Sequence, residues 1–231
     1  MNNVGRYELK YIFDEIRFHE ILTWLHTNMN LREEYPVRIV NSLYFDDINF
    51  QSVRDNLSGI PDRKKRRLRW YNDFQSKNVV NPVLEIKWRK GRLVYKDASP
   101  LPELKDKLLF IESRSIVNNI NNILHDKESP LGVLDDHMNP TLLVSYERQY
   151  CNDIEGLRVT IDRNITFNYV MPHNSLSDCP TYLYPNSIIE FKFPVELKNY
   201  VSTLIRYSNL QPKRHSKYLT GLAAYGLVTY L

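Results

Sequence analysis

Basic side chains that could bind phosphate gather in residues 64–71, where five of the first six residues are lysine or arginine. Within this stretch Leu68 and Trp70 alternate with Arg67 and Arg69. Alternation with period two is typical of a strand with one buried face, so both arginines are expected on the face opposite the apolar pair. Arginine forms paired hydrogen bonds with phosphate oxygens. The stretch therefore indicates phosphate recognition, although a strand whose charged face is simply solvated would show the same pattern.

The same alternation of charged and apolar residues recurs in five other segments. The polar positions of all six segments are Arg6, Glu8 and Lys10; Arg67 and Arg69; Glu85, Lys87 and Arg89; Tyr146 and Arg148; Arg158 and Asp162; and Glu190 and Lys192. Solvated sheet faces usually mix Ser, Thr, Asn and Gln among their charges, whereas Arg, Lys and Glu dominate here. Two interpretations stay open at this point. One is a sheet with a solvated face. The other is a closed or nearly closed antiparallel β-barrel with its apolar face outward under helices and its charged face lining the lumen.

The barrel interpretation also predicts a class of ligand. Many cations inside a lumen are unfavourable unless an anion compensates their charge, so the ligand is expected to be polyanionic and elongated. Glutamates interleaved among the cations suit a divalent metal ion, which prefers oxygen ligands and bridges phosphate groups.

Composition excludes several classes of protein. The chain has 231 residues with 42% hydrophobic and 25% charged residues, which suits a single domain over residues 1–231 with a sizeable core. Its net charge of +4 is modest, so an anion site must come from local concentration of charge. Two cysteines, Cys151 and Cys179, form neither a disulfide framework nor a CxxC metal motif. No signal peptide and no apolar run of membrane-spanning length is present, so a cytoplasmic location is expected.

The remaining pattern predicts an α+β protein. Strands are expected at residues 6–12, 41–47, 64–71, 83–89, 93–96, 141–150, 157–162 and 187–193. A helix capped by Asp14 is expected at 15–29, a helical turn at 50–57, a helix at 195–207 and a last helix after the basic segment 211–218. Residues 102–126 carry apolar residues at helical spacing and predict two helices with a break at 113–115. Residues 168–186, rich in Pro, Asn and Ser, predict a long loop.

Taken in order, short motifs along almost the whole chain resemble one protein family. They are Arg6-Tyr7-Glu8-Leu9-Lys10-Tyr11, Ser42-Leu43-Tyr44-Phe45-Asp46-Asp47, Arg67-Leu68-Arg69-Trp70-Tyr71, Leu84-Glu85-Ile86-Lys87, Tyr146-Glu147-Arg148, Arg158-Val159-Thr160-Ile161-Asp162, Ile189-Glu190-Phe191-Lys192 and Ser216-Lys217-Tyr218. The chain thus resembles the VTC domain, the polyphosphate-polymerase domain of the vacuolar transporter chaperone complex. That family belongs to the CYTH-like, or triphosphate tunnel metalloenzyme, superfamily.

This resemblance implies an antiparallel barrel around a basic tunnel. It also implies transfer of the γ-phosphoryl group of ATP to a growing inorganic polyphosphate chain, with Mn²⁺ or Mg²⁺ as cofactor. The residues that match the family's phosphate ligands in the tunnel are Lys10, Arg67, Arg69, Lys87, Arg148 and Lys217. Further phosphate-binding residues implied by it are Lys96, Tyr146, Arg158, Lys192, Arg214 and Ser216. Glu190 matches the metal carboxylate, with Glu8 as a second candidate.

Two positions depart from the family pattern. Arg6 stands where related triphosphatases carry a glutamate, which argues against plain triphosphatase chemistry. His215 stands where the family has an aromatic residue before Ser216. The chain also lacks the phosphate-sensing SPX domain and the membrane helices of the eukaryotic complex, so a stand-alone bacterial member is expected.

Other interpretations of the charged residues remain open. The protein could hydrolyse triphosphate or nucleoside triphosphates, or bind polyphosphate without catalysis. Nucleic acid is a poorer candidate ligand because most aromatic residues lie on the parity opposite the charges. Structural roles are also expected: Glu85 pairing with Lys87 or Arg69, and Asp162 orienting Arg158. Residues 64–66 are expected to be solvated at the barrel mouth.

Overall fold

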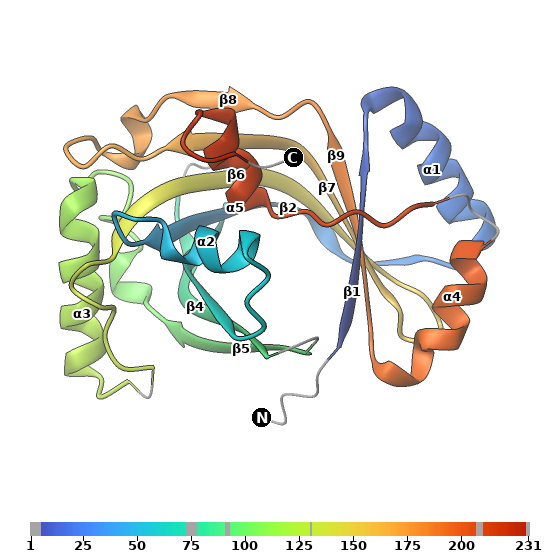
Figure 1. Cartoon of the computed structure of the whole chain (residues 1–231), viewed down its shortest axis with the longest axis horizontal. Coiled ribbons are helices and arrows are strands. Elements are labelled where there is room, and N and C mark those ends of the chain that lie inside the picture. Colours follow the sequence, from blue (N-terminus) through green and yellow to red (C-terminus); the bar gives the residue numbers. More distant parts are fainter. Residues whose placement is uncertain (1–5, 73–77, 91–92, 130, 207–209, 230–231) are drawn as a thin grey trace.

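A nine-stranded antiparallel sheet forms the centre of the molecule (Figure 1). The computed structural model describes residues 6–72, 78–90, 93–129, 131–206 and 210–229. The strands are β1 (Tyr7–Phe13), β2 (Arg32–Asp46), β3 (Arg63–Asn72), β4 (Val80–Lys90), β5 (Leu93–Pro100), β6 (Asn139–Asn152), β7 (Arg158–Tyr169), β8 (Thr181–Leu183) and β9 (Ser187–Phe193). They pair in the order β1-β9-β7-β6-β2-β3-β4-β5, with β8 added to β7. The predicted α+β class with a large antiparallel sheet is confirmed; the assignment of residues 1–231 to one domain stays a prediction.

Strand register brings the charged positions of different strands onto one face of this sheet. Lys10 on β1 lies opposite Glu190 on β9, and Arg148 on β6 lies opposite Asp162 on β7. Farther along the sheet, β3 and β4 pair in the same way, with their charged residues facing one another. Because side chains alternate across a strand, the same register sends the apolar positions to the other face.

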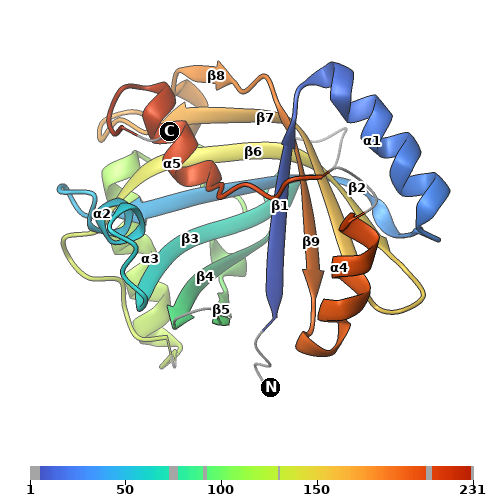
Figure 2. The same ribbon diagram turned by 45° about the vertical axis from the view of Figure 1, so that its right-hand side comes forward.

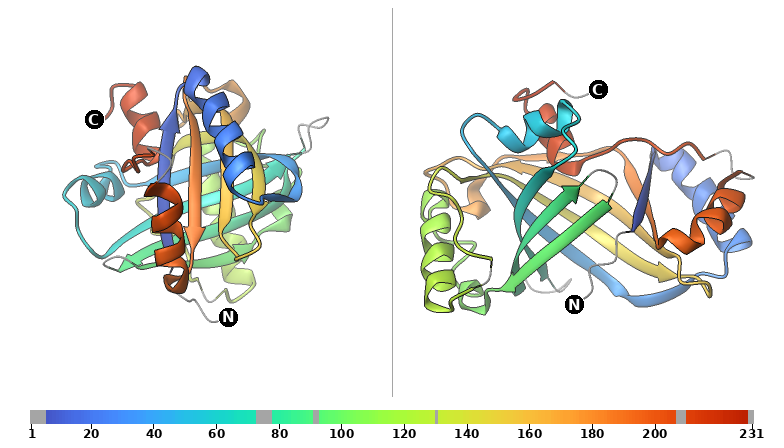
Figure 3. Two further views of the ribbon diagram at one scale, coloured as in Figure 1. Left: turned by 90° about the vertical axis from the view of Figure 1, so that its right-hand side faces the viewer. Right: turned by 60° about the horizontal axis from the view of Figure 1, so that its bottom comes forward.

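The sheet is curled but not closed, unlike the barrel expected from the sequence. Its ends are β1 and β5, and the ladders among the described residues do not join them. Part of the free edge of β1 is taken by the segment before the last helix, where the Lys213 amide donates to the Lys10 carbonyl at 2.8 Å. Curling still brings the two ends near each other, since Lys87 on β4 lies 3.0 Å from Glu8 on β1. Figures 2 and 3 show β1 standing at one end of the curled sheet.

Helices cover the outer, apolar face of the sheet in two groups. Helices α1 (Glu15–Asn28) and α4 (Lys198–Arg206) pack on β1, β9 and β7. Helix α3 (Ile116–Asp126) packs on β2, β3 and β6 at the opposite end of the molecule. Asp14 caps α1 as predicted, accepting a hydrogen bond from the Arg17 amide at 2.8 Å. No helix among the described residues has the length and hydrophobicity needed to cross a membrane.

Helix α5 (Lys217–Ala224) lies on the concave face, which corrects the expectation that all helices pack outside. Leu142 shares the parity of Arg148 on β6, and it contacts α5 so closely that a Cβ on Gly221 would lie 2.5 Å from it. Leu219 and Leu222 are fully buried in the same cluster. The concave face therefore has an apolar end sealed by α5, and the first residue of α5, Lys217, lies beside its charged part.

Several boundaries differ from the sequence prediction. Strand β2 begins nine residues before the predicted segment, because its exposed first half shows no alternation and is held by pairing with β6. Only α3 is an α-helix within residues 102–126; short 3₁₀ turns at Pro102–Leu104 and Ser113–Ser115 precede it, the second at the predicted break. Strands β7 and β8 extend into the predicted loop 168–186. The remaining helical segments are α2 (Gln51–Leu57) and the 3₁₀ turns Leu176–Asp178 and Val195–Leu197.

Candidate functional site

Charged side chains from seven strands and from α5 meet on the concave face, in a group that we call the concave cluster. Its cations are Lys10, Lys65, Arg67, Arg69, Lys87, Lys96, Arg148, Lys192 and Lys217, and its carboxylates are Glu8, Glu85, Asp162 and Glu190. Cations thus outnumber carboxylates by nine to four. Charges of one sign lining a concave surface raise the local concentration of oppositely charged ligands. The cluster is therefore suited to a polyanion.

Glu85 holds the cations of β3 and β5 in place. Its Oε2 lies 2.7 Å from an Arg67 nitrogen and 4.0 Å from Arg69, and its Oε1 lies 3.0 Å from Lys96. Burial alone would raise the pKa of Glu85, but Arg67 and Arg69 outweigh burial and lower it. The expected ion pair between Glu85 and Arg69 is present, but its distance of 4.0 Å is long. The alternative pairing with Lys87 is wrong, because Lys87 bonds to Glu8.

Glu190 is surrounded by lysines from three elements. Lys10 lies 3.2 Å away, Lys192 2.9 Å and Lys217 3.7 Å. Burial would raise the pKa of Glu190, yet these lysines and Arg148 hold it well below its usual range. The carboxylate is therefore ionised and fixed at the point where β1, β9 and α5 meet.

Asp162 ties β6 to α5. It is fully buried and accepts two hydrogen bonds from Arg148, at 2.5 and 2.6 Å, and one from Lys217 at 2.5 Å. The expectation that it orients Arg158 is wrong, because Arg158 lies at the first residue of β7 with an exposed side chain. Asp162 instead fixes two cations whose exposed fractions are only 6% and 7%.

Tyrosine hydroxyls add neutral hydrogen-bonding groups to the site. Arg69 donates to the Tyr146 hydroxyl at 3.2 Å, and Arg67 donates to the Tyr44 hydroxyl at 3.4 Å. Sequence reasoning singled out Tyr146 but missed Tyr44, although Tyr44 lies directly opposite Arg67 in the register. Burial would raise the pKa of Tyr44, but the two arginines outweigh burial and lower it.

Lys65 is a second residue that the sequence interpretation missed. It was expected to be solvated, yet its side chain is half-buried and donates to the Ser216 hydroxyl at 3.0 Å. It has the same strand parity as Arg67 and Arg69, and this signal could have placed it in the site. Ser216 also caps α5 by accepting from the Leu219 amide.

Two other sequence-predicted phosphate ligands lie at the edges of the concave cluster. Lys96 is about half exposed, with 52% of its side chain accessible. Arg214 is exposed on the segment before α5 and lies near Arg63, whose pKa is lowered by burial first and then by Arg89 and Arg214. Cations thus continue from the cluster towards one end of the concave face.

The carboxylates of the site have the chemistry that Mg²⁺ or Mn²⁺ requires, though the described residues do not form a metal cage made of protein ligands alone. Magnesium commonly takes one or two carboxylates and completes its shell with phosphate oxygens and water. Glu190 and Glu8 are the carboxylates that could hold such an ion. Burial would raise the pKa of Glu8, but Lys87, Lys10 and Lys192 together outweigh burial and lower it to about 2, so Glu8 is ionised at neutral pH.

His215, which stands before Ser216, packs its ring among side chains of the concave face. Its ring stacks on Tyr184 with centroids 5.9 Å apart, and its Nδ1 lies 3.3 Å from the Thr220 hydroxyl. Burial and the nearby Lys217 and Lys10 lower the pKa of His215 to about 3. The ring is therefore neutral at physiological pH and functions as an aromatic surface.

This shift predicts a pH-dependent effect of His215→Phe. The unfolded chain binds a proton at this ring near pH 6.5, and the folded chain only near pH 3. The free energy of unfolding of the wild type therefore falls by about 1.4 kcal/mol for each pH unit below 6.5. Urea unfolding at pH 7.5 and pH 5 should show the variant gaining about 2 kcal/mol relative to wild type as the pH falls. An equal difference at both pH values would contradict the neutral buried ring.

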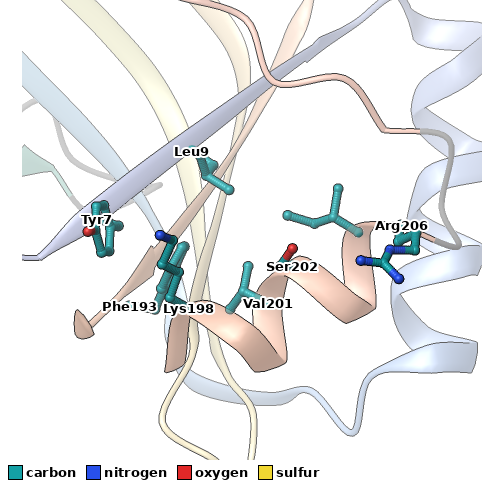
Figure 4. A pocket seen from close by; sticks show the side chains of 8 residues that line it. Tyr7, Leu9, Phe193, Lys198, Val201, Ser202 and Arg206 are labelled. Atoms are coloured by element: carbon teal, nitrogen blue, oxygen red, sulfur yellow. The ribbon is translucent and has the colours of Figure 1, made fainter. Parts of the chain in front are cut away.

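A separate hollow of about 400 Å³ lies on the outer side of β1, away from the concave cluster. Figure 4 shows it between the strand residues Tyr7, Leu9 and Phe193 and one side of α4. Its lining is mostly apolar, with Lys198 and Arg206 from α4 as its charged residues. The hollow carries two cations, against nine in the concave cluster, so we place the candidate site in the concave cluster.

The fold resembles several solved structures at low sequence identity. A protein from Pyrococcus horikoshii OT3 is 12% identical, with a TM-score of 0.53 and coverage of 95% of this chain and 98% of that one. A Vibrio parahaemolyticus protein described as an adenylate cyclase candidate is 11% identical, with a TM-score of 0.54 and coverage of 96% and 99%. A Hippeastrum adenylyl cyclase candidate, described as having a dominant triphosphatase activity, is 14% identical, with a TM-score of 0.52 and coverage of 97% of each chain. These likenesses support the tunnel fold expected from the sequence.

No curated protein is significantly similar to the chain in sequence. The model of the VTC domain family, in contrast, matches residues 5–225. This match covers β1 to α5 and therefore every member of the concave cluster. The resemblance seen in the sequence motifs is confirmed: the chain belongs to the VTC domain family.

Proposed function

We propose that this protein is a metal-dependent polyphosphate polymerase that transfers the γ-phosphoryl group of ATP to a growing inorganic polyphosphate chain. The observation that carries the proposal is the concave cluster itself, in which eight of nine cations are ion-paired to four carboxylates, in a VTC-family chain. Members of this family are expected to handle triphosphate and polyphosphate. The elongated, strongly cationic surface suits a linear chain of phosphates better than a compact anion.

Positioning and charge stabilisation supply most of the catalysis in phosphoryl transfer. The guanidinium groups of Arg67, Arg69 and Arg148 would bind the triphosphate. Carboxylates already fix these groups, so they need little reorganisation at the moment of reaction. The terminal phosphate of the acceptor would attack the γ-phosphorus in line, and ADP would leave. No protein nucleophile is required.

A divalent ion held by Glu190, with Glu8 as a second ligand, would supply charge neutralisation at the phosphate oxygens. The lysines around Glu190 would bind the phosphate oxygens directly. Lys10 and Lys192 form ion pairs with the Glu190 carboxylate. With a divalent ion bound to that carboxylate, both lysines would bind phosphate oxygens instead.

A second candidate function is hydrolysis of triphosphate, with water in place of the phosphate acceptor. The dominant triphosphatase activity described for the Hippeastrum protein of similar fold favours this alternative. The absence of a glutamate at Arg6 weakens it, because the first strand then offers one carboxylate, Glu8, to a metal ion.

Product analysis separates these functions. Incubating the chain with ATP and Mn²⁺ should give long polymer on a gel, with little orthophosphate, and Glu190→Ala should abolish the product. Orthophosphate without polymer would establish the hydrolase instead. Tight polyphosphate binding with neither product would leave a binding module.

A further inference from the structure

Lys65 differs from the other buried cations of the concave cluster in its partners. Each of the others lies within 4.0 Å of at least one carboxylate oxygen. Within the described part of the chain, Lys65 has no carboxylate at this distance, and its hydrogen bond goes to the neutral Ser216 hydroxyl. Its ammonium group therefore has donors left to offer to a ligand.

Three cations lie near Lys65. Lys10 on β1, Lys87 on β4 and Arg63 on β3 are near enough to repel it, and Asp46 at the end of β2 offers a weaker attraction. Lys87 also lies directly opposite Lys65 in the register of β3 and β4. A cation in this position is unfavourable in the free protein and becomes favourable when an anion binds beside it.

We propose that Lys65, with Lys87 and the Ser216 hydroxyl, forms a terminal-phosphate subsite that continues the triphosphate site towards Arg63, the first residue of β3. This inference rests on the proposed function and deepens it. Lys65 is the next residue to Arg67 on the concave face of β3. A phosphate chain that lies on Arg69 and Arg67 therefore reaches Lys65 before it leaves the concave face. Nothing in the VTC-family motifs of this chain includes Lys65.

Binding at this subsite should be coupled to proton uptake. Burial, then Lys10, Lys87 and Arg63, lower the pKa of Lys65 to about 7 in the free protein. At pH 8 the free amine is then about nine-tenths neutral, and a bound phosphate restores its proton. At pH 6 the amine is already charged, so the uptake assigned to Lys65 should nearly disappear.

Titration calorimetry with inorganic tripolyphosphate, in two buffers of different ionisation enthalpy, tests this subsite. At pH 8 the wild type should take up about 0.9 more proton per tripolyphosphate bound than Lys65→Met does, because the ligand's own protonation is common to both. The variant should also bind about tenfold more weakly. Lys65→Arg, which stays charged throughout, should bind tightly without the extra proton uptake.

Lys64→Met is the matched control, since it removes the same charge from the neighbouring residue on the other face of β3. Lys64 is exposed and lies over the Trp88 ring at 4.0 Å. This control should bind and take up protons as the wild type does. If Lys65→Met matches the wild type in affinity and proton uptake, the subsite is disproved and the proposed function stands. If the wild type does not bind tripolyphosphate, the proposed function itself is disproved, and the subsite with it.

Discussion

Replacing Arg67 with alanine is expected to lower kcat for phosphoryl transfer from ATP by about 10²–10³-fold. Arg67 lies at the centre of β3, and two of its guanidinium nitrogens lie 2.7 and 2.8 Å from the Oε2 atom of Glu85. Such a fixed guanidinium needs no reorganisation to stabilise charge in the transition state, so its loss affects kcat more than KM. Arg67→Lys should recover only part of the rate, because an ammonium lacks the paired donors.

The neighbouring Arg66 provides the control for this prediction. Arg66 has the opposite parity and forms an ion pair with Asp135, at 2.8 Å, on the outer side of β3. Arg66→Ala removes an equal charge from the adjacent position and should change kcat less than threefold. Equal losses in the two variants would mean that total charge, and not the placement of Arg67, determines the rate.

Strand parity predicted a large part of this site because it is a local property. Arg67, Arg69 and Glu85 needed only the alternation within their own strands, and register then brought them together. The same rule also covers Lys65, which was discounted as part of a basic run because a run of charges usually indicates a solvated segment. Alternation was the better guide there.

Contacts between distant parts of the chain could not be read from such patterns. Asp162 bonds to Lys217, 55 residues farther on, and no local spacing predicts that pair. The amphipathic pattern of α5 shows that one side is apolar, but not which face of the sheet it meets. The free edge of β1 is partly occupied by the distant segment around Lys213, and no local pattern predicts that contact.

Replacing Asp162 with asparagine is expected to destabilise the fold by about 3–5 kcal/mol. The substitution removes the nearer counter-ion of Arg148 and Lys217, whose exposed fractions are 6% and 7%, and leaves them the more distant Glu190, at 3.9 and 3.7 Å. Asparagine keeps a hydrogen-bond acceptor for one of them, but it removes the charge that compensates both. Urea unfolding at pH 7.5 measures the loss.

Asp153→Asn controls for the loss of a buried carboxylate as such. Asp153 is also buried, but it accepts from the backbone amides of Glu155 and Leu157 and from the Tyr200 hydroxyl, and it forms no ion pair with a cation among the described residues. Its amide variant keeps most of these bonds and should cost only about 1 kcal/mol. Similar losses in the two variants would contradict the role of Asp162 as a counter-ion.

The unstable Asp162→Asn variant is nevertheless expected to bind tripolyphosphate more tightly than the wild type. Removing one of four carboxylates leaves Arg148 and Lys217 to be neutralised by the ligand, so anion binding relieves a cost that the wild type does not have. Saturating tripolyphosphate should therefore raise the melting temperature of the variant by more than that of the wild type. This opposite response of stability and affinity would show that the carboxylates of the concave cluster hold its cations in place while the ligand is absent. If the ligand stabilises both proteins equally, Asp162 serves the packing of α5 and not the charge of the site.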